Sequence, residues 1–289
     1  MRSYFAVFFL GLLALEACSF RSIVIHPDIP YMEEGFLDEL PEKQLTVYAP
    51  KKVKSEPYPV LLFIHGGSWR SGNKEKYIPL GRRFARKGYV TVIIDYPLSP
   101  TYKVHSMGKA SAKAVDWTHR HIGDFGGDPN NLFVSGHSAG GHLAALISVR
   151  DEYFDSIGVA SNPIRGAVLI DPAGLDMFTY LVEANNAPGT SHNRTFTDSP
   201  EVWRDASPMY HLHDAMPPMM IMVGGRTEPS ILHGADRFME AHAPYTPQPG
   251  FYLQKRKKHI PMIVQFLYTP SKTYRRVREF VETNRSHEL

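Results

Sequence analysis

Cysteine is nearly absent from this chain of 289 residues, which contains one, Cys18. A single cysteine excludes an internal disulfide, so burial of apolar side chains must hold the core together. A chain of this length can bury enough apolar surface to do so. Hydrophobic residues make up 43% of the chain and charged residues 21%, which is the balance of a globular protein and not of a disordered one.

Sequence patterns that would indicate a metal or a nucleotide cofactor are also missing. His119 and His121 lie two positions apart, so they do not share a helical face. The motif Gly126-Gly127-Asp128 lacks the glycine spacing of a dinucleotide-binding loop. We therefore expect no metal site and no cofactor.

Charge of one sign does not dominate the chain, whose formal net charge is +3. The densest basic run is Lys255-Arg256-Lys257-Lys258. Four cations at the end of a strand are more typical of a solvated edge than of a phosphate-binding surface, so we do not expect nucleic-acid binding.

Long apolar runs are confined to the N-terminal region, where Phe5 to Leu15 is almost unbroken. This length is typical of the apolar region of a signal peptide and is short for a membrane span. The run ends in Leu15-Glu16-Ala17-Cys18, which resembles a bacterial lipoprotein signal although Glu16 departs from its usual small or apolar residue. We expect an exported protein, either a cell-envelope lipoprotein lipidated at Cys18, and so anchored to a membrane, or a secreted protein with an ordinary cleaved signal.

Strand-like apolar runs alternate with helical patterns over the rest of the chain. The expected strands are Gln44–Tyr48, Val60–Ile64, Tyr89–Asp95, Asn131–Ser135, Gly166–Ile170, Met219–Val223 and Phe251–Gln254, with helices near Ala110–His121 and Ser271–Thr283. This alternation predicts an α/β fold with a mostly parallel sheet flanked by helices, in which ligands bind at the carboxyl ends of the strands. We expect a signal over residues 1–18, a tether and entry segment over 19–40, and one domain over 41–289. The segment Leu181 to Pro200 is expected to be a loop or lid over the site.

The motif Gly136-His137-Ser138-Ala139-Gly140 stands between an expected strand and a helical run. This is the context of a nucleophile elbow, in which glycines allow the strand and helix to pack closely while the serine hydroxyl stays exposed. The helix N-terminus adds positive potential where an oxyanion forms. The sequence therefore predicts that Ser138 is a catalytic nucleophile.

The segment His65-Gly66-Gly67-Ser68-Trp69 directly follows the buried strand Val60–Ile64. Glycines there allow backbone N–H groups to approach a ligand, as acyl transfer requires. Together with Phe125–Asn131 and Gly136–Leu143, this motif resembles the α/β-hydrolase esterases, of the hormone-sensitive-lipase-like and feruloyl-esterase-like branch that includes kynurenine formamidases. The resemblance covers about Leu45 to Phe280. It implies that the backbone N–H groups of Gly67, Ser68 and Ala139 form the oxyanion hole.

A serine nucleophile needs a base, and the base needs an orienting carboxylate. His259 follows the last expected strand, where the resemblance implies the catalytic histidine. The acid is expected just past Met219–Val223. Thr227 stands at the usual place and cannot carry charge, so we favour Glu228, one residue further on, over Asp236.

The sequence thus predicts a serine esterase that acts on a small-molecule carboxylic ester through an acyl-enzyme intermediate. One alternative is an amide hydrolase of the arylformamidase type, which shares every motif named above. Another is a hydrolase-fold binding protein with a degraded triad, which Thr227 alone supports. The natural substrate and the oligomeric state do not follow from the sequence.

Overall fold

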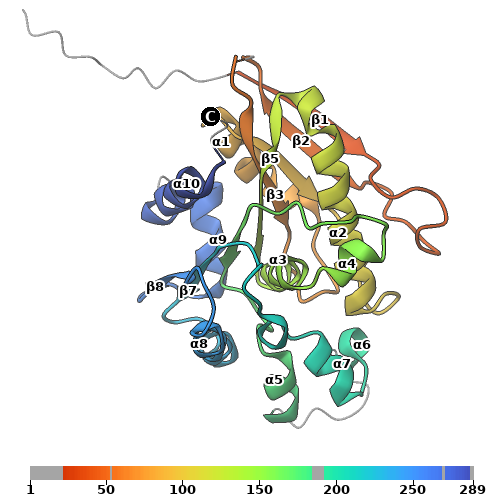
Figure 1. The fold of residues 1–289 in the computed structure, drawn as a ribbon, viewed down its shortest axis with the longest axis vertical. Helices are drawn as coiled ribbons and strands as arrows, with labels where there is room; N and C mark the ends of the chain where they lie inside the picture. Colours follow the sequence, from red (N-terminus) through yellow and green to blue (C-terminus); the bar gives the residue numbers. More distant parts are fainter. Residues whose placement is uncertain (1–21, 53, 184–191, 269–270, 287–289) are drawn as a thin grey trace, which may run out of the picture.

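The computed structural model describes residues 22–52, 54–183, 192–268 and 271–286, and its centre is an eight-stranded sheet (Figure 1). The strand order is β1-β2-β4-β3-β5-β6-β7-β8. The strands are β1 (Ile23–Ile29), β2 (Leu45–Pro50), β3 (Tyr58–Ile64), β4 (Val90–Ile94), β5 (Gly127–His137), β6 (Gly166–Ile170), β7 (Met219–Gly224) and β8 (Gly250–Gln254). From β4 to β8 all neighbours are parallel, whereas β1 and β2 pair antiparallel. The predicted mostly parallel α/β sheet is confirmed.

The first strand corrects one expectation, because β1 lies inside the segment predicted to be a tether. It pairs antiparallel with β2, with Ile23 opposite Pro50 and Ile25 opposite Tyr48. Every residue of β1 is exposed or only partly buried, since it is the edge strand of the sheet. The strand was missed because its side chains show neither a buried apolar run nor regular alternation.

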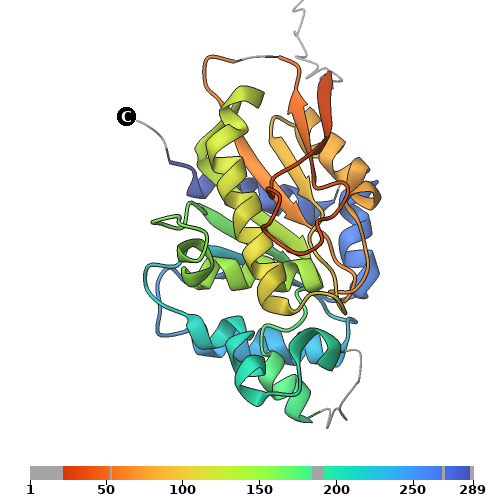
Figure 2. The same cartoon turned by 90° about the vertical axis from the view of Figure 1, so that its right-hand side faces the viewer.

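Helices cover both faces of the sheet, and each face has its own apolar core. One face carries α1 (Ile78–Arg86), α9 (His259–Leu267) and α10 (Lys272–Asn284); the other carries α2 (Val104–His121), α3 (Ala139–Val149), α4 (Glu152–Asp155) and α8 (Pro229–His242) (Figure 2). Phe84 and Phe266 are buried on the first face, and Leu143 and Phe238 on the second. Strands covered on both faces are continuously apolar, as β3 and β6 are.

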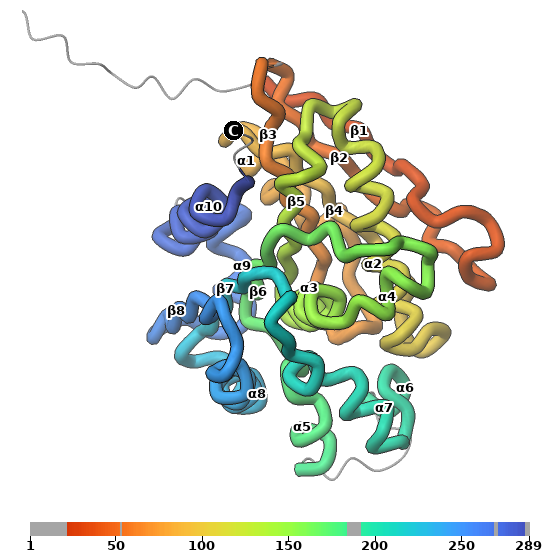
Figure 3. The backbone as a smooth tube through the Cα atoms, in the orientation of Figure 1, coloured from red at the N-terminus to blue at the C-terminus, as the bar shows by residue number. Residues whose placement is uncertain are grey.

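Three short helices form a further layer at one end of the molecule, beyond the sheet (Figure 3). They are α5 (Met177–Glu183), α6 (Asn193–Phe196) and α7 (Pro200–Asp205). The predicted loop or lid Leu181 to Pro200 falls partly on residues 184–191, outside the described residues, and its remainder includes the end of α5 and all of α6. Single 3₁₀ turns complete the described elements, at η1 (Lys74–Tyr77), η2 (Ile122–Phe125) and η3 (Pro208–His211). Among the described helices, none is both long and apolar enough to cross a bilayer.

Candidate active site

Three polar side chains from the carboxyl ends of different strands meet in one hydrogen-bonded row. The Ser138 Oγ lies 2.9 Å from His259 Nε2, and His259 Nδ1 lies 2.6 Å from Asp171 Oδ2. A carboxylate only accepts hydrogen bonds, so Nδ1 carries the proton and Nε2 is free to accept from the serine hydroxyl. This is the arrangement that a serine needs in order to act as a nucleophile.

Ser138 occupies a strained turn between β5 and α3, with φ 56° and ψ −120°. The turn is possible because its neighbours lack side chains. A Cβ on Gly136 would lie 2.2 Å from the carbonyl oxygen of Gly140, and a Cβ on Gly140 would lie 2.0 Å from that of Ile64. The nucleophile-elbow geometry predicted for this motif is therefore present.

The carboxylate beside His259 belongs to Asp171, and the prediction that Glu228 takes this place is wrong. Glu228 is exposed and stands before the first residue of α8. Asp171 directly follows β6, is fully buried, and accepts a 2.7 Å hydrogen bond from the Gly224 backbone N–H. The hydroxyl of Thr227 also donates to Asp171 Oδ2. Thr227 thus occupies the position where the acid was expected, and from there its hydroxyl binds the carboxylate of Asp171.

A signal for Asp171 was present in the sequence, since it directly follows the apolar run Gly166–Ile170. The prediction placed the acid after β7 alone. Because β6 pairs in parallel with both β5 and β7, the carboxyl ends of all three strands meet at one edge of the sheet. Asp236, the other residue considered, lies on α8 and is not part of the row. With Asp171 present, Thr227 no longer supports a degraded triad.

The loop after β3 lies against the elbow, as the glycine motif predicted. A Cβ on Gly66 would lie 3.3 Å from the Cβ of Ser138. No hydrogen bond to another described residue engages the backbone N–H groups of Gly67 and Ser68. Ala139 is the first residue of α3, so its N–H is one of those that a helix leaves unpaired. These three donors remain available to a bound oxyanion.

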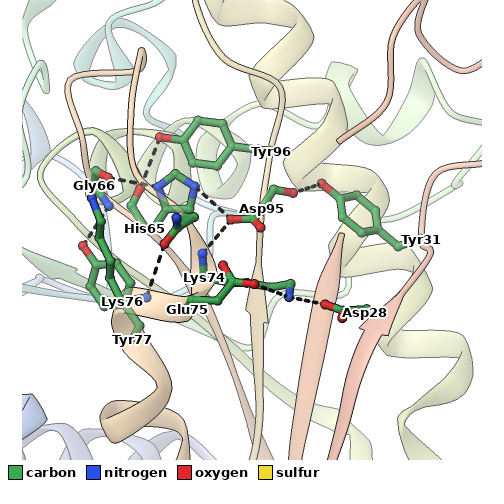
Figure 4. A network of polar contacts seen from close by, with 11 residues as sticks. Asp28, Tyr31, His65, Gly66, Lys74, Glu75, Lys76, Tyr77, Asp95 and Tyr96 are labelled. Atoms are coloured by element: carbon green, nitrogen blue, oxygen red, sulfur yellow. Dashed lines mark hydrogen bonds and ion pairs between the residues drawn. The ribbon is translucent and has the colours of Figure 1, made fainter. Parts of the chain in front are cut away.

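A network of polar contacts supports the loop after β3 (Figure 4). The His65 Nδ1–H donates to the Gly66 carbonyl over 2.9 Å, and its Nε2 lies 3.4 Å from Asp95 Oδ1. The same Asp95 oxygen accepts from the Lys74 backbone N–H at 2.6 Å. The Tyr96 hydroxyl donates to the His65 carbonyl, and its ring stacks on the imidazole with centroids 4.4 Å apart. His65 therefore supports the loop and does not face the nucleophile.

Trp69 ties the loop to α3. Its indole Nε1–H donates to His142 Nδ1 over 3.1 Å, and His142 Nε2–H donates to the Ala206 carbonyl over 2.7 Å. An indole has no acceptor, so His142 must be neutral to make both bonds. Complete burial lowers the pKa of His142 to about 4, which keeps the ring neutral.

A second buried imidazole packs against the catalytic row. The ring of His137 lies 4.6 Å from that of His259, and its Nε2–H donates to the His259 carbonyl. Burial, followed by the nearby His259, lowers the pKa of His137 to about 3. His137 is therefore neutral. It holds the backbone of His259 through the hydrogen bond to its carbonyl and places no positive charge beside the imidazole of His259.

Residues 45–233 match the model of one protein family, BD-FAE. The chain belongs to the BD-FAE family. The match contains Ser138 and Asp171 and ends before His259, whose place in the row is shown by its hydrogen bond to Ser138 and not by the family match.

Curated relatives of this BD-FAE protein are esterases. Esterase LipC of Mycobacterium tuberculosis is 30% identical over 200 residues, which are 64% of this chain and 48% of LipC. The probable carboxylic ester hydrolase LipM of the same organism is 29% identical over 81% of this chain and 56% of LipM. This chain thus spans about half the length of these relatives. Esterase B from Lactobacillus rhamnosis has a similar fold, with a TM-score of 0.72 and 20% identity over 90% of this chain and 84% of that one.

Proposed function

We propose that this BD-FAE protein is a serine hydrolase that cleaves small carboxylic esters. The observation that carries the proposal is the hydrogen-bonded row Ser138–His259–Asp171, with its nucleophile strained at the head of α3. The names of the curated relatives, esterase and carboxylic ester hydrolase, also support it.

In the proposed mechanism, His259 Nε2 takes the proton of Ser138 as Oγ attacks the ester carbonyl. The N–H groups of Gly67, Ser68 and Ala139 stabilise the oxyanion, and Asp171 stabilises the imidazolium through Nδ1–H. His259 then protonates the leaving alkoxide. A water molecule deprotonated by the same nitrogen attacks the acyl-enzyme and releases the acid.

A fluorophosphonate probe tests this proposal directly, because it labels only an activated serine. The wild-type chain should be labelled and should hydrolyse a p-nitrophenyl ester, whereas Ser138→Ala should lose both properties and keep its circular dichroism spectrum. Ser106→Ala, on α2 and away from the row, is the matched control and should behave as wild type. Labelling of Ser138→Ala would identify a different nucleophile. Hydrolysis of the p-nitrophenyl ester but not of the matched p-nitroanilide would identify an esterase and not an amide hydrolase.

We also propose that the protein is exported and lipidated at Cys18. Support comes from the apolar run Phe5 to Leu15 and the Leu15-Glu16-Ala17-Cys18 sequence that follows it. Mass spectrometry of the protein from a bacterial host should find a diacylglycerol-modified Cys18 as the first residue, and Cys18→Ser should abolish the modification. An unmodified first residue beyond position 18 would indicate plain secretion instead.

A further inference from the structure

Helix α9 has an exposed apolar stripe that no described element covers. Ile260 and Val264 on the helix, and Tyr268, which directly follows its last residue, are 60%, 41% and 70% exposed. The four-residue spacing of Ile260 and Val264 places them on one face of the helix, and Tyr268 follows at the C-cap. The opposite face, with Met262 and Phe266, is buried in the core shared with α1 and α10. The stripe is therefore not part of the fold's own packing.

Basic residues precede and follow this stripe in the sequence. Residues 241–278 contain eight Lys or Arg residues and no Asp or Glu, although the whole chain has 32 basic and 29 acidic residues. The exposed basic side chains on either side of α9 in the sequence are Lys255, Arg256 and Lys258, in the loop before it, and Lys272, Arg275 and Arg276 on α10. Within the described residues, no ion pair engages Lys255, Arg256, Lys258 or Lys272. The nearest acids along the chain are Glu240, exposed on α8, and Glu279, which pairs with Arg275.

Contacts between β8 and α10 place the two groups of cations beside the helix. The Arg276 guanidinium lies 4.2 Å from the ring centroid of Tyr252 on β8. Gln254, the last residue of β8, bonds both Gln265 on α9 and Thr273 on α10. The loop 255–258 and the first turns of α10 thus flank α9.

We propose that this surface, the exposed stripe of α9 with its flanking cations, docks the protein on an anionic lipid membrane. An apolar helix face framed by lysine and arginine is the composition that binds in the interface of such membranes, with Tyr268 suited to the headgroup level. The cations beside the stripe favour binding to a negatively charged surface over binding to a second copy of this chain, which would carry the same cations. Because α9 begins at His259, docking brings the catalytic row next to the lipid surface.

Tryptophan fluorescence in the full chain tests the contact. Val264→Trp is mixed with phosphatidylcholine vesicles that contain brominated acyl chains, with and without phosphatidylglycerol. We expect quenching by the anionic vesicles only, and its loss in about 1 M salt, where the screening length falls to about 3 Å. The matched control is Leu253→Trp, which starts from the same 41% exposure on the face of β8 that α9 does not cover. It should be quenched far less.

A second pair of variants tests the charges in the Val264→Trp background. Lys255→Glu with Arg256→Glu should weaken vesicle binding by at least about tenfold, since each cation near an anionic surface contributes roughly fivefold in affinity. Lys51→Glu with Lys52→Glu makes the same charge change after β2, towards the other edge of the sheet, and should have little effect. All variants keep residues 1–21, so any attachment through that segment is common to them.

The proposal is overturned if Val264→Trp is not quenched by anionic vesicles, or if Leu253→Trp is quenched equally. It is also overturned if the Val264→Trp emission shifts with protein concentration in the absence of lipid, which would indicate that a second copy covers the stripe. None of these measurements depends on ester hydrolysis, so their failure would leave the proposed function untouched.

Discussion

Asp171 connects two neighbouring strands through its carboxylate. It follows β6, yet it accepts from Gly224 at the end of β7 and from His259 after β8. Each oxygen has a fixed donor, so the group cannot rotate away from the imidazole. A buried, ionised carboxylate is the element that holds the correct histidine tautomer in such a row.

Asp171→Asn should therefore lower kcat by about 10⁴-fold, because a neutral amide favours the wrong tautomer and does not stabilise the imidazolium. The p-nitrophenyl ester assay measures this. Glu228→Gln is the control and should retain wild-type kcat. If Glu228→Gln is inactive and Asp171→Asn is active, the row seen here is not the catalytic one.

Thr227 acts on the reaction through Asp171. Its hydroxyl donates to Oδ2, the same oxygen that binds His259. Thr227→Val removes this donor without changing the size of the side chain. Since a hydrogen bond to a charged group is worth about 1.5–3 kcal/mol, kcat should fall roughly ten- to a hundredfold.

The split between kinetic constants identifies this positioning role. KM should stay unchanged in Thr227→Val, and Thr227→Ser should restore most of kcat because it keeps the hydroxyl. Equal loss in the valine and serine variants would mean that the methyl group, and hence packing, is what matters at this position.

At the scale of elements, the loop between β3 and η1 owes its position to glycine. Gly67 has φ +139°, and a Cβ there would lie 1.9 Å from the Ser71 carbonyl oxygen. The Gly67 carbonyl in turn accepts from the backbone N–H groups of Arg70 and Ser71, which closes a tight turn. Only a residue without a side chain fits this turn, so its N–H groups remain next to Ser138.

Gly67→Val should displace the turn and remove an oxyanion donor. Losing one such donor lowers kcat by about 10²–10³-fold. Ser68→Ala should be nearly silent, because the side chain is exposed and only its backbone N–H is used. Near-ultraviolet circular dichroism checks that the valine variant is folded; a folded Gly67→Val enzyme with normal kcat would contradict the assigned oxyanion hole.

At the scale of the whole molecule, buried histidines make stability depend on pH. The pKa values of His137 and His142 are lowered to about 3 and about 4 by burial, from about 6.5 in the unfolded chain. Between these values and pH 6.5 the unfolded chain binds protons that the folded chain does not. The contribution of these two histidines to the free energy of unfolding is therefore complete above pH 6.5. It is lost as the pH falls from 6.5 towards their pKa values in the folded chain.

Denaturant titrations between pH 7 and pH 4 measure this slope. His142→Gln should flatten it, because one of the depressed groups is gone, although the loss of packing lowers stability at pH 7. His233→Gln, which replaces an exposed histidine on α8, should leave the slope unchanged. Parallel curves for His142→Gln and wild type would show that His142 does not carry the dependence.

The resemblance to the esterases implied His259, and the sequence by itself determined the parallel sheet and the elbow at Ser138. Each depends on a local pattern: continuous apolar runs predict strands buried on both faces, and glycines on either side of a serine allow one strained turn. Only the tertiary structure decided the acid. Strands β6 and β7 end side by side, so carboxylates after either strand are candidates, and the choice of Asp171 over Glu228 depends on which side chain is buried against His259. The tertiary structure also decided β1, because an exposed edge strand has no periodic pattern in the sequence. It likewise showed the apolar stripe of α9, since the stripe is exposed only because the other face of the helix is the one that packs in the core.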